Sequence, residues 1–535
     1  MSKHTILTLL AAASLLATDT QALVEPVLLS QYPQKTRTFY PLDSRDVPPL
    51  LCTDAVPLPV GEVTAAAHSR DGATWLGTKH GLVRIDESVL ERDRHQYLAG
   101  LRYLPDDEVR QIIPDTRSGV WVRTRTGISH IELVLMPLLE KARLYEARIR
   151  ARHDRYGLIS DSVLGAPGDI KQNRLIDNDN DGLWTSIYAA AECFRYRVTH
   201  EQEALMNARK SIEAMLFLEE VTGIKGFPAR SYVRKGDPMP TDGEWHWTQD
   251  GNYYWKGDTS SDEIVGHFFM YGVAHDSLPD GGLKRRVVEA ARRVMDHIIE
   301  HDYKLVGPEG RGTTWGWWGP KKVAAEPDEH ALNSLQLLSF LKTAAHLTHD
   351  QKYEAEYRKA AWEWHYAEWI TKLKDYRLEM NYSDEELAFL PLYSLFVYEK
   401  DPRLKEAYQK AGEAWWENIH REANPLWTFI YAKGHSVTQA EMNSAAWTLI
   451  RQPLDTIKWS VHNSSRQDIV LAVPVDRFGK REALTLLPPD ERPIMRWNSN
   501  PFVVDSGEGG MSEDDGAAFL LPYWMGRYEG FLKGE

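Results

Sequence analysis

Cysteine and positive charge are both scarce in this chain. Its 535 residues include two cysteines, and 63 Lys and Arg stand against 77 Asp and Glu, so the formal net charge is −14. An acidic chain is not drawn electrostatically to nucleic acid or to an anionic membrane surface, which argues against both as partners. Cys52 and Cys193 have no spacing motif. They either pair in an oxidising compartment or, as the apolar surroundings of Cys193 favour, remain buried thiols.

Long apolar runs are also missing. The stretch Ile6–Leu16 is too short to cross a bilayer, which needs ~20 apolar residues, so no membrane span is expected. It follows the basic residues Lys3 and His4 and precedes the small-residue site Thr20–Ala22, a pattern typical of a cleavable signal peptide. We therefore expect residues 1–22 to be removed and the mature protein to be periplasmic or secreted.

Several catalytic signatures are absent as well. The chain has no G-x-S-x-G elbow, no Walker loop, no G-x-G-x-x-G after a strand and no H-E-x-x-H. The run Asp177-x-Asp179-x-Asp181 begins like an EF-hand calcium loop, but Tyr188 stands where the bidentate Glu belongs. The histidines show no close metal spacing either, so no metal site is predicted.

Residues 23–135 are predicted to form a small β-rich domain that contains an internal repeat. Thr74–Asp86 aligns with Val120–Glu132, and each copy has one Trp followed by a Gly turn. The spacing falls in the range of a propeller blade, one four-stranded unit per ~40–50 residues. The pattern resembles the propeller repeat of two-component regulators. Two copies cannot close a propeller of ~4–8 blades, so we favour a cap without a binding role of its own.

Residues 136–535 are predicted to be mainly helical. Apolar residues recur at i, i+3, i+4 and i+7 over 135–156, 183–198, 201–222, 264–275, 283–302, 330–348, 352–374, 387–398, 402–422, 440–451 and 517–530. One strand is expected over Gln467–Val475. Roughly a dozen helices in one domain favour paired hairpins closed into an (α/α)6-type toroid, with an open solenoid as the rival architecture.

Four clusters of acids open helical segments in this part of the chain. They are Asp177–Trp184, Asp258–Ile264, Ser383–Leu387 and Ser512–Gly516. Acids at a helix start are explained by capping and by the helix dipole, and Ser383-x-x-Glu386 is a complete capping box. They are equally a way to build a ring of carboxylates for sugar chemistry. Asp514 belongs to a Gly-rich segment that is expected to line such a site.

The run around Asp258 and Asp262 is the densest polar segment of the helical domain. A helix that starts near Ser261 places Glu263 and His267 on one face, where a carboxylate tunes a histidine as a base. The aromatics Tyr254 and Trp255 precede it as a wall for a sugar. A core histidine is the alternative interpretation of His267.

Aromatic side chains are abundant, with 19 Trp and 24 Tyr, and flat rings suit stacking on sugars. Trp184 lies beside Asp181 in the sequence. The non-helical segment Arg311–Pro320 contains Arg311, which suits bidentate binding of a uronate carboxylate, and three tryptophans that suit stacking. These are Trp315, Trp317 and Trp318. Packing between helical hairpins is the alternative for at least one of the three.

Acid-rich helix starts and aromatic loops in an exported chain resemble the six-hairpin (α/α)6 carbohydrate-active superfamily, which includes unsaturated glucuronyl and rhamnogalacturonyl hydrolases and several uronate lyases. Asp181, Asp258 and Asp262 resemble the aspartates of the glucuronyl hydrolases. The resemblance covers residues 136–535. It implies processing of uronic-acid oligosaccharides or polysaccharides without a metal or an organic cofactor.

Three functions follow as hypotheses. The first is a glycoside hydrolase in which Asp181 and Asp262 (or Asp258) form the acid/base pair, His267 supports them, and Arg311 with its tryptophans holds the sugar. The second is a polysaccharide lyase that uses His267 and Tyr254 in an elimination. The third is a non-catalytic glycan-binding or sensory protein, suggested by the blade-like repeat. Nothing in the sequence predicts the oligomeric state.

Overall fold

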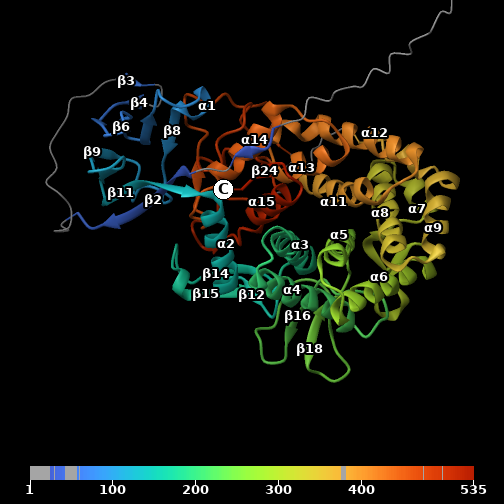
Figure 1. Cartoon of the computed structure of the whole chain (residues 1–535). Helices are drawn as coiled ribbons and strands as arrows, with labels where there is room; N and C mark the ends of the chain where they lie inside the picture. Colours follow the sequence, from blue (N-terminus) through green and yellow to red (C-terminus); the bar gives the residue numbers. More distant parts are fainter. Residues whose placement is uncertain are drawn as a thin grey trace, which may run out of the picture.

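A β-rich N-terminal part and a larger helical part make up the structure of the protein, a computed structural model (Figure 1). The structure describes residues 25–28, 31–42, 57–58, 61–374, 381–473, 475–476, 478–496 and 498–534. The predicted signal peptide and Cys52 lie outside the described residues, whereas Cys193 is buried. No helix within the described ranges is long and apolar enough to cross a membrane.

Two four-stranded antiparallel sheets form the N-terminal part. The first has the order β5 (Ala65–His68), β6 (Thr74–Thr78), β7 (Gly81–Ile85) and β8 (His95–Leu98). The second has the order β2 (Gln31–Tyr40), β11 (Ile128–Pro137), β10 (Val120–Thr124) and β9 (Val109–Pro114). Each copy of the repeat forms a hairpin of one sheet, and apolar residues of both sheets share one small core. The β-rich character predicted for this region is confirmed.

The repeat copies differ in how their tryptophans are used. Trp75 is fully buried in the shared core, and its indole donates to the Ser69 hydroxyl. Trp121 is half-buried and stacks on His130 with 4.0 Å between ring centroids. The chain then passes without a linker from β11 into α2 (Leu138–Arg152), so the sheet and the helical part are continuous at this point.

Six helices are buried almost all round and pack on one another in a closed order (Figure 1). In chain order they are α3 (Asp181–Thr199), α5 (Ser261–Ser277), α8 (His330–Thr348), α11 (Tyr382–Tyr398), α13 (Pro425–Gly434) and α15 (Ala517–Tyr528). Each contacts the next, and α15 packs back on α3. A helix that is apolar on all faces is stable only inside a protein, which is why these six form the inside.

A second set of helices covers the six. It comprises α2, α4 (Gln202–Glu220), α6 (Gly282–Glu300), α9 (Gln351–Arg358), α12 (Pro402–Ile419) and α14 (Gln439–Arg451). They are amphipathic: α6 buries Val287, Ala290, Ala291 and Val294 at helical spacing and exposes charged residues on its other face. We refer to the six buried helices as the inner ring and to these as the outer helices.

Most predicted helices match the structure, two expectations are wrong, and one helix was not predicted. The segment predicted as one helix over 352–374 is divided into α9, a π-turn and α10 (Tyr366–Trp369), because His365 adopts a left-handed φ of 61°. Helix α13 was not predicted. The expected strand Gln467–Val475 has no strand among its described residues beyond a single bridge at Leu471.

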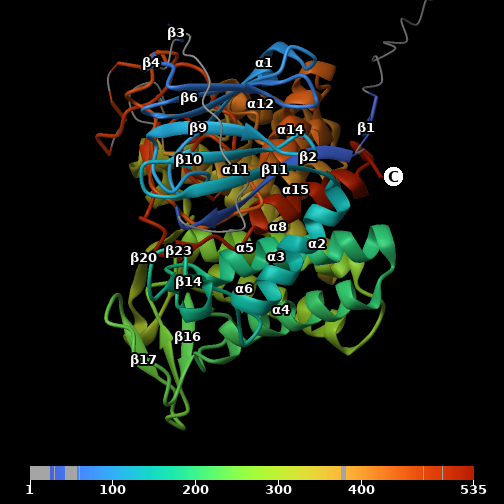
Figure 2. The same cartoon turned by 90° about the vertical axis from the view of Figure 1, so that its left-hand side faces the viewer.

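Small sheets precede several inner helices and collect on one side of the ring (Figure 2). Before α3 lie β12 (Asp154–Arg155), β13 (Leu158–Ile159), β14 (Asp161–Leu164) and β15 (Asn173–Ile176). Before α5 lie β16 (Ser231–Arg234), β17 (Trp245–Trp247) and β18 (Tyr253–Lys256). Before α8 lie β19 (Lys304–Val306), β20 (Gly312–Trp317) and α7 (Pro320–Ala325).

A long irregular segment between α14 and α15 completes this side. It contains β21 (Val461–His462), β22 (Asp505–Ser506) and β23 (Ser512–Glu513). Strand β23 pairs with β14, which brings the start of α15 beside the start of α3. At the other end of the chain β1 (Val27–Leu28) pairs with β24 (Leu532–Lys533). The remaining short elements are β3 (Pro57–Leu58), β4 (Gly61–Glu62) and α1 (Glu91–Arg94).

Candidate functional site

The four acidic runs all open helices of the inner ring, namely α3, α5, α11 and α15. Their starts meet at one end of the ring. The Asn180 amide before α3 donates to Asp262 of α5 at 3.2 Å, and Asp384 of α11 acts electrostatically on Asp262. Arg496 lies over the Trp184 ring of α3 and near the charge of Asp514 before α15. The acids therefore form one cluster in space.

None of these described acids is the N-cap residue of its helix. The N-caps are Asn180, Ser260, Asn381 and Gly516, and none makes a side-chain cap hydrogen bond. The capping box predicted at Ser383 is wrong, because α11 begins one residue earlier at Tyr382. Outer helices differ, since α9, α12 and α14 start at side-chain caps from Asp350, Asp401 and Thr438. Asp181, Asp262 and Asp384 thus have side-chain partners from other elements or residues, whereas Asp514 and Asp515 bind the start of their own helix.

Asp181 is fully buried at the start of α3. Its carboxylate accepts hydrogen bonds from the Arg155 guanidinium and from the Ser231 hydroxyl. Burial raises the pKa of Asp181 to about 6, although Arg155 and Ser231 oppose the shift. The hydrogen-bonding capacity of the carboxylate is thus taken up by groups of the protein. Asp181 therefore connects β12, β16 and α3.

The two preceding acids are neutralised by cations from the β16–β18 sheet. Asp179 lies 3.0 Å from Lys256 Nζ and 3.1 Å from an Arg230 nitrogen, and Asp177 lies 3.7 Å from the same lysine. Arg230 and Lys256 were not predicted. They stand outside the acidic run, in strands and turns whose sequence shows no spacing relation to it.

Asp258 is tied to the neighbouring hairpin. It adopts a left-handed φ of 46°, and its Oδ1 accepts the backbone N–H of Thr314 at 2.7 Å. This bond fixes the β19–β20 hairpin against the start of α5. Asp258 is therefore placed to position the Trp315 hairpin.

Asp262 and Asp384 differ from the other acids of the cluster. Asp262 is half-buried, accepts from the Asn180 amide, and lies in the first turn of α5. Burial raises its pKa, Arg230 opposes this, and the negative charges of Asp384 and Asp179 raise it further. Asp384 forms an ion pair with Lys374 and accepts from the Asn381 amide at 2.9 Å. The carboxyl of Asp262 is thus biased towards its protonated form, while the carboxyl of Asp384 is ion-paired with a lysine.

Glu263 and His267 lie on one face of α5, as predicted, but both are fully buried against α3. His267 Nδ1 donates to the Glu263 carbonyl at 2.7 Å, and burial lowers the pKa of His267 to about 4. Glu263 Oε1 accepts the Gly182 N–H at 3.1 Å. A Cβ at Gly182 would lie 1.9 Å from Glu263 Oε2, so only glycine fits there. The structure places His267 as a core histidine.

Arg496 forms a flat platform with Trp184. Its guanidinium carbon lies 3.9 Å above the indole centroid and pairs with Asp161. Trp184 Nε1 donates to Asn178 Oδ1 at 3.1 Å, and the Asn178 amide donates to Asp161 at 2.8 Å. The four side chains hold one another in a fixed orientation at the edge of the acidic cluster.

Asp514 is buried just before α15. Burial and the adjacent charge of Asp515 raise the pKa of Asp514 to about 6, against Lys458 and Arg496. Its Oδ1 accepts the Gly516 N–H at 3.0 Å, and Asp515 accepts the Ala517 N–H at 2.5 Å. These bonds shape the turn into α15.

A cavity of about 690 Å³ opens beside this cluster. The start of α11 and the irregular segment before α15 form its walls, and the lining includes Asp161, Tyr382, Lys458, Lys480, Arg496 and Glu508. Sites of ~300–1,000 Å³ hold small organic ligands, so this volume suits a short oligosaccharide. Glu508 of the segment that precedes α15 lines this cavity, whereas Asp514 does not.

The predicted aromatic residues divide into exposed and buried sets. Trp315 at the β20 hairpin is 58% exposed, and Trp247 of β17 is 50% exposed. Tyr254 packs against Trp247 with 4.9 Å between centroids. Trp255 and Trp318 are buried, and the Trp318 indole donates to Gln336 at 2.7 Å.

The remaining members of that loop lie at the surface. Trp317 is half-buried under Lys322, whose Nζ lies 4.9 Å from the ring centroid. The exposed Arg311 lies 3.3 Å from Glu309 and 3.7 Å from Glu244. Trp315 and Trp247 are therefore the exposed rings of this region, and Tyr254 lies between Trp245 and Trp247.

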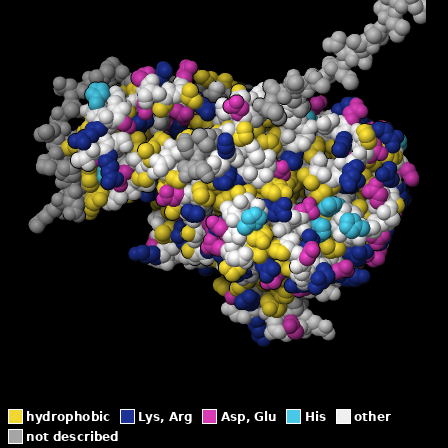
Figure 3. Space-filling model, in the orientation of Figure 1, with side chains coloured by type: hydrophobic (Ala, Val, Ile, Leu, Met, Phe, Trp, Pro, Cys, Tyr) yellow, Lys and Arg dark blue, Asp and Glu magenta, His cyan; other side chains and the backbone are white. Residues whose placement is uncertain are grey.

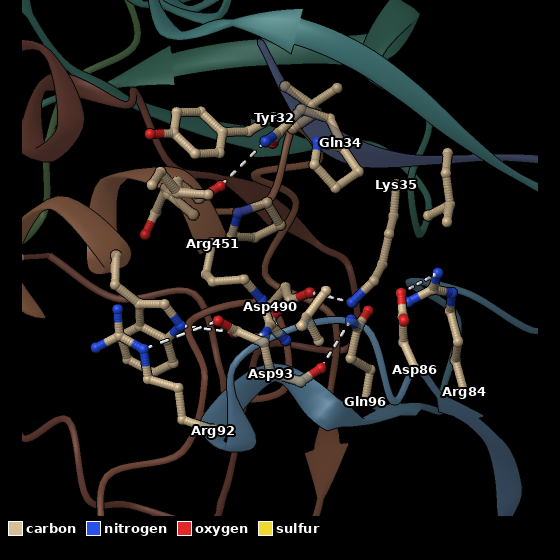
Figure 4. Close-up of a pocket in the computed structure, with 18 of the residues that line it drawn as sticks. Tyr32, Gln34, Lys35, Arg84, Asp86, Arg92, Asp93, Gln96, Arg451 and Asp490 are labelled. Atoms are coloured by element: carbon tan, nitrogen blue, oxygen red, sulfur yellow. Dashed lines mark hydrogen bonds and ion pairs between the residues drawn. The ribbon is translucent and has the colours of Figure 1, made fainter. Parts of the chain in front are cut away.

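A second cavity, of about 560 Å³, lies between the N-terminal sheets and α14 (Figure 4). Its charged groups pair with one another: Arg451 lies 2.6 Å from Asp93 and 2.7 Å from Asp490, and Lys35 binds Asp490. Burial raises the pKa of Asp490, but Arg451 and Lys35 outweigh it, so the pKa is lowered. An ionised, saturated carboxylate is a poor proton donor, and these pairs join the two parts of the molecule.

Comparison with known proteins assigns no family. No family model matches the chain, and no curated protein matches it. A glycoside hydrolase family 76 mannosidase from Bacteroides thetaiotaomicron is 12% identical, with a TM-score of 0.40 over 74% of this chain and 98% of that one. A sugar epimerase from a ruminal bacterium (12%, TM-score 0.36, 72% and 97%) and a cellobiose 2-epimerase from Bacillus thermoamylovorans (10%, 0.35, 72% and 98%) are similar to this degree. Similarities of this size assign neither a family nor an activity.

Proposed function

We propose that the chain is a carbohydrate-active enzyme that hydrolyses glycosidic bonds at the end of the inner ring where α3, α5, α11 and α15 begin. The observation that carries this is the pair Asp262 and Asp384 in the first turns of α5 and α11, where Ser383, the residue before Asp384, lines a cavity of about 690 Å³. The closed order of inner and outer helices supports an (α/α)6 toroid. At this end of the ring, loops and small sheets precede the inner helices, and all four acidic runs named above lie here.

Asp262 suits the role of general acid. Its raised pKa keeps a proton available, which passes to the leaving glycosidic oxygen as the bond from that oxygen to the anomeric carbon breaks. Asp384, which is ion-paired with Lys374, suits the second carboxylate, which either attacks the anomeric carbon or removes a proton from the attacking water. Asp384 replaces Asp181 in the predicted pair, because Asp181 is fully buried and saturated by Arg155 and Ser231.

An acidic glycan is the substrate class we propose. Lys458, Lys480 and Arg496 line the cavity. Lys458 and Arg496 have carboxylate partners, whereas Lys480 Nζ reaches the Ser506 hydroxyl at 3.4 Å and has no acidic partner among the described residues. Lys480 is therefore available to bind a uronate carboxylate. The exposed rings of Trp247 and Trp315 suit stacking on further sugar units.

The lyase alternative receives no support from the residues proposed for it. His267 is buried in the core, whereas Tyr254 lies in the β18 strand beside Trp247, so the two side chains do not form a base and acid pair at one site. We further propose export through the N-terminal signal. N-terminal sequencing of the mature protein tests it, with cleavage after Ala22 as the expected result and an intact N-terminus as the contrary one.

The experiment is a panel of uronate-containing and neutral oligosaccharides, assayed for new reducing ends and for ultraviolet absorbance of unsaturated uronates. New reducing ends without new absorbance support hydrolysis, and gain of absorbance supports elimination. We expect Asp262→Asn and Asp384→Asn each to lower kcat by roughly 10²–10⁴-fold. Asp280→Asn is the matched control, because Asp280 is almost fully exposed between α5 and α6.

Retention of full activity by Asp262→Asn would overturn the site assignment. Calorimetric binding of a glycan without turnover of any member of the panel would favour the non-catalytic glycan-binding protein instead.

A further inference from the structure

Three potential metal ligands meet at the end of the inner ring opposite the candidate sugar site. His275 and Asp276 lie in the last turn of α5, and His346 lies in the last turn of α8. One ligand atom from each lies within 4.8 Å of the others. Histidine side chains gather on this face of the molecule around α5 and α8 (Figure 3). Asp262, by contrast, opens the first turn of α5.

The separations of these atoms are close to those that a bound ion imposes. Asp276 Oδ1 lies 2.9 Å from His275 Nδ1 and 3.1 Å from His346 Nε2. Zinc bonds to nitrogen and oxygen are ~2.0–2.2 Å, so ligand atoms around a tetrahedral zinc ion lie ~3.3 Å apart. The carboxylate therefore needs to move from each imidazole by only a few tenths of an ångström to admit an ion, and the two imidazole nitrogens lie within 4.8 Å of each other.

A second set of contacts orients two of the ligands. The Tyr398 hydroxyl, at the end of α11, donates to Asp276 Oδ2 at 2.8 Å. The Tyr398 ring stacks on His346 with 4.0 Å between centroids and an angle of 17°. A Cβ at Gly272 would lie 2.8 Å from the Tyr398 oxygen, so the glycine admits this hydroxyl. Hydrogen-bonded partners of this kind fix the ligands of metal sites and raise their affinity.

Access and charge also suit a divalent ion. The side chains of His275, Asp276 and His346 are 18%, 38% and 34% exposed, so an ion reaches them and water has room for a fourth position. Two neutral imidazoles and one carboxylate carry a single negative charge, and nitrogen and oxygen donors of this kind are preferred by zinc.

A second cluster, Asp115, His130 and Glu132 on the N-terminal sheets, is less suited. It offers one imidazole, which stacks on Trp121. Asp115 Oδ1 already accepts the backbone N–H groups of Arg117 and Gly119, at 2.7 and 3.0 Å, so this carboxylate is used to close a turn.

We propose that His275, Asp276 and His346 bind one zinc-type divalent transition-metal ion. The ion joins the ends of α5 and α8, and Tyr398 extends the connection to α11. Because the ligands lie at the end of the ring away from Asp262, the ion stabilises the helical ring and takes no part in sugar chemistry. This inference stands independently of the proposed function.

The test is calorimetric titration of ZnCl2 into the full mature chain after chelator treatment and removal of any affinity tag. We expect one Zn²⁺ per chain, loss of this site in Asp276→Asn and in His346→Gln, and unchanged binding in Asp115→Asn. Tyr398→Phe keeps the stoichiometry but binds roughly 10–100-fold more weakly, which a mere folding defect does not produce. Addition of Co²⁺ to the wild-type chain gives visible bands of a nitrogen- and oxygen-ligated ion.

Circular dichroism and melting temperature establish that each variant is folded. The proposal is overturned if the wild-type chain binds no Zn²⁺, or if Asp276→Asn and His346→Gln leave the binding unchanged. Loss of the site in Asp115→Asn alone also overturns it and places the ion on the N-terminal sheets.

Discussion

Glu513→Gln tests whether the start of α15 is held in place by charge. Glu513 lies in β23, immediately before the acids Asp514 and Asp515, and is almost fully buried. Arg152 of α2 donates to both of its oxygens at 2.7 Å, and His153 and Arg148 lie at 3.4 and 3.3 Å. Burial raises the pKa of Glu513, but these cationic partners outweigh it and lower the pKa from 4.5 to about 2.

The magnitude follows from the depressed pKa. A shift from 4.5 to about 2 corresponds to about 3 kcal/mol of stability when the carboxylate is ionised. Arg152 is 22% exposed, so water screens part of the interaction and we expect Glu513→Gln to cost about 2 kcal/mol at pH 7. A depressed folded-state pKa gives stability that is present above pH 4.5 and lost as the pH falls through about 2. At pH 3 the difference between wild type and variant therefore shrinks to roughly half.

The assay is urea unfolding followed by tryptophan fluorescence, at pH 7 and at pH 3. Glu368→Gln is the matched control, because Glu368 lies on the surface of α10, and its unfolding curve is expected to match that of the wild type at both values of pH. An equal loss of stability at pH 7 and pH 3 would refute the electrostatic reasoning and leave packing as the cause. No loss at pH 7 would show that Arg152 and Glu513 contribute nothing net.

Three further results are expected. Asp262→Asn abolishes most turnover on the true substrate while its melting temperature stays near that of the wild type, as steady-state kinetics and calorimetry will show. Gly182→Ala costs about 1–3 kcal/mol in urea unfolding, because its Cβ would lie 1.9 Å from Glu263 Oε2, and a neutral result would mean that α3 and α5 move apart freely. Trp315→Ala weakens glycan binding without changing stability, whereas Trp318→Ala costs about 3–5 kcal/mol and leaves the binding constant of the folded fraction unchanged.

The helical part of the fold was largely predictable from the period of its apolar residues. The bounds of α8 match the predicted range, and α3, α4 and α5 differ from prediction by a few residues. Helix α13 was not predicted because it is short and apolar on all faces, so its sequence shows no apolar stripe at helical spacing. Its signal was the pair Asn424 and Pro425, a side-chain cap followed by a proline at the first helical position.

The partners of the predicted acids were not predictable in the same way. Arg155, Arg230 and Lys256 reach Asp181 and Asp179 from strands and turns that stand before or after the acidic run in the chain. Sequence periodicity describes contacts within one element, whereas these contacts join elements that meet only after the ring closes. Asp384 lies within the run Ser383–Leu387, which the sequence predicts to be a capping box. Only the position of the start of α11, and the ion pair with Lys374, give it another role.

A carboxylate that caps a helix is therefore distinguished from one available for catalysis by the hydrogen-bond donors that its oxygens contact. At the outer helices, Asp350 and Asp401 accept the N–H groups of Lys352 and Arg403, so their charge is used in starting α9 and α12. At the inner ring the first-turn acid Asp262 accepts from a side chain of the neighbouring helix start. Except for α13, which starts at the side-chain cap Asn424, the inner helices are held by burial on all sides and do not need a side-chain cap for stability. Because burial stabilises these helices, their first turns are free to present carboxyl groups at the end of the ring. There burial and repulsion between neighbouring carboxylates raise the pKa of Asp262.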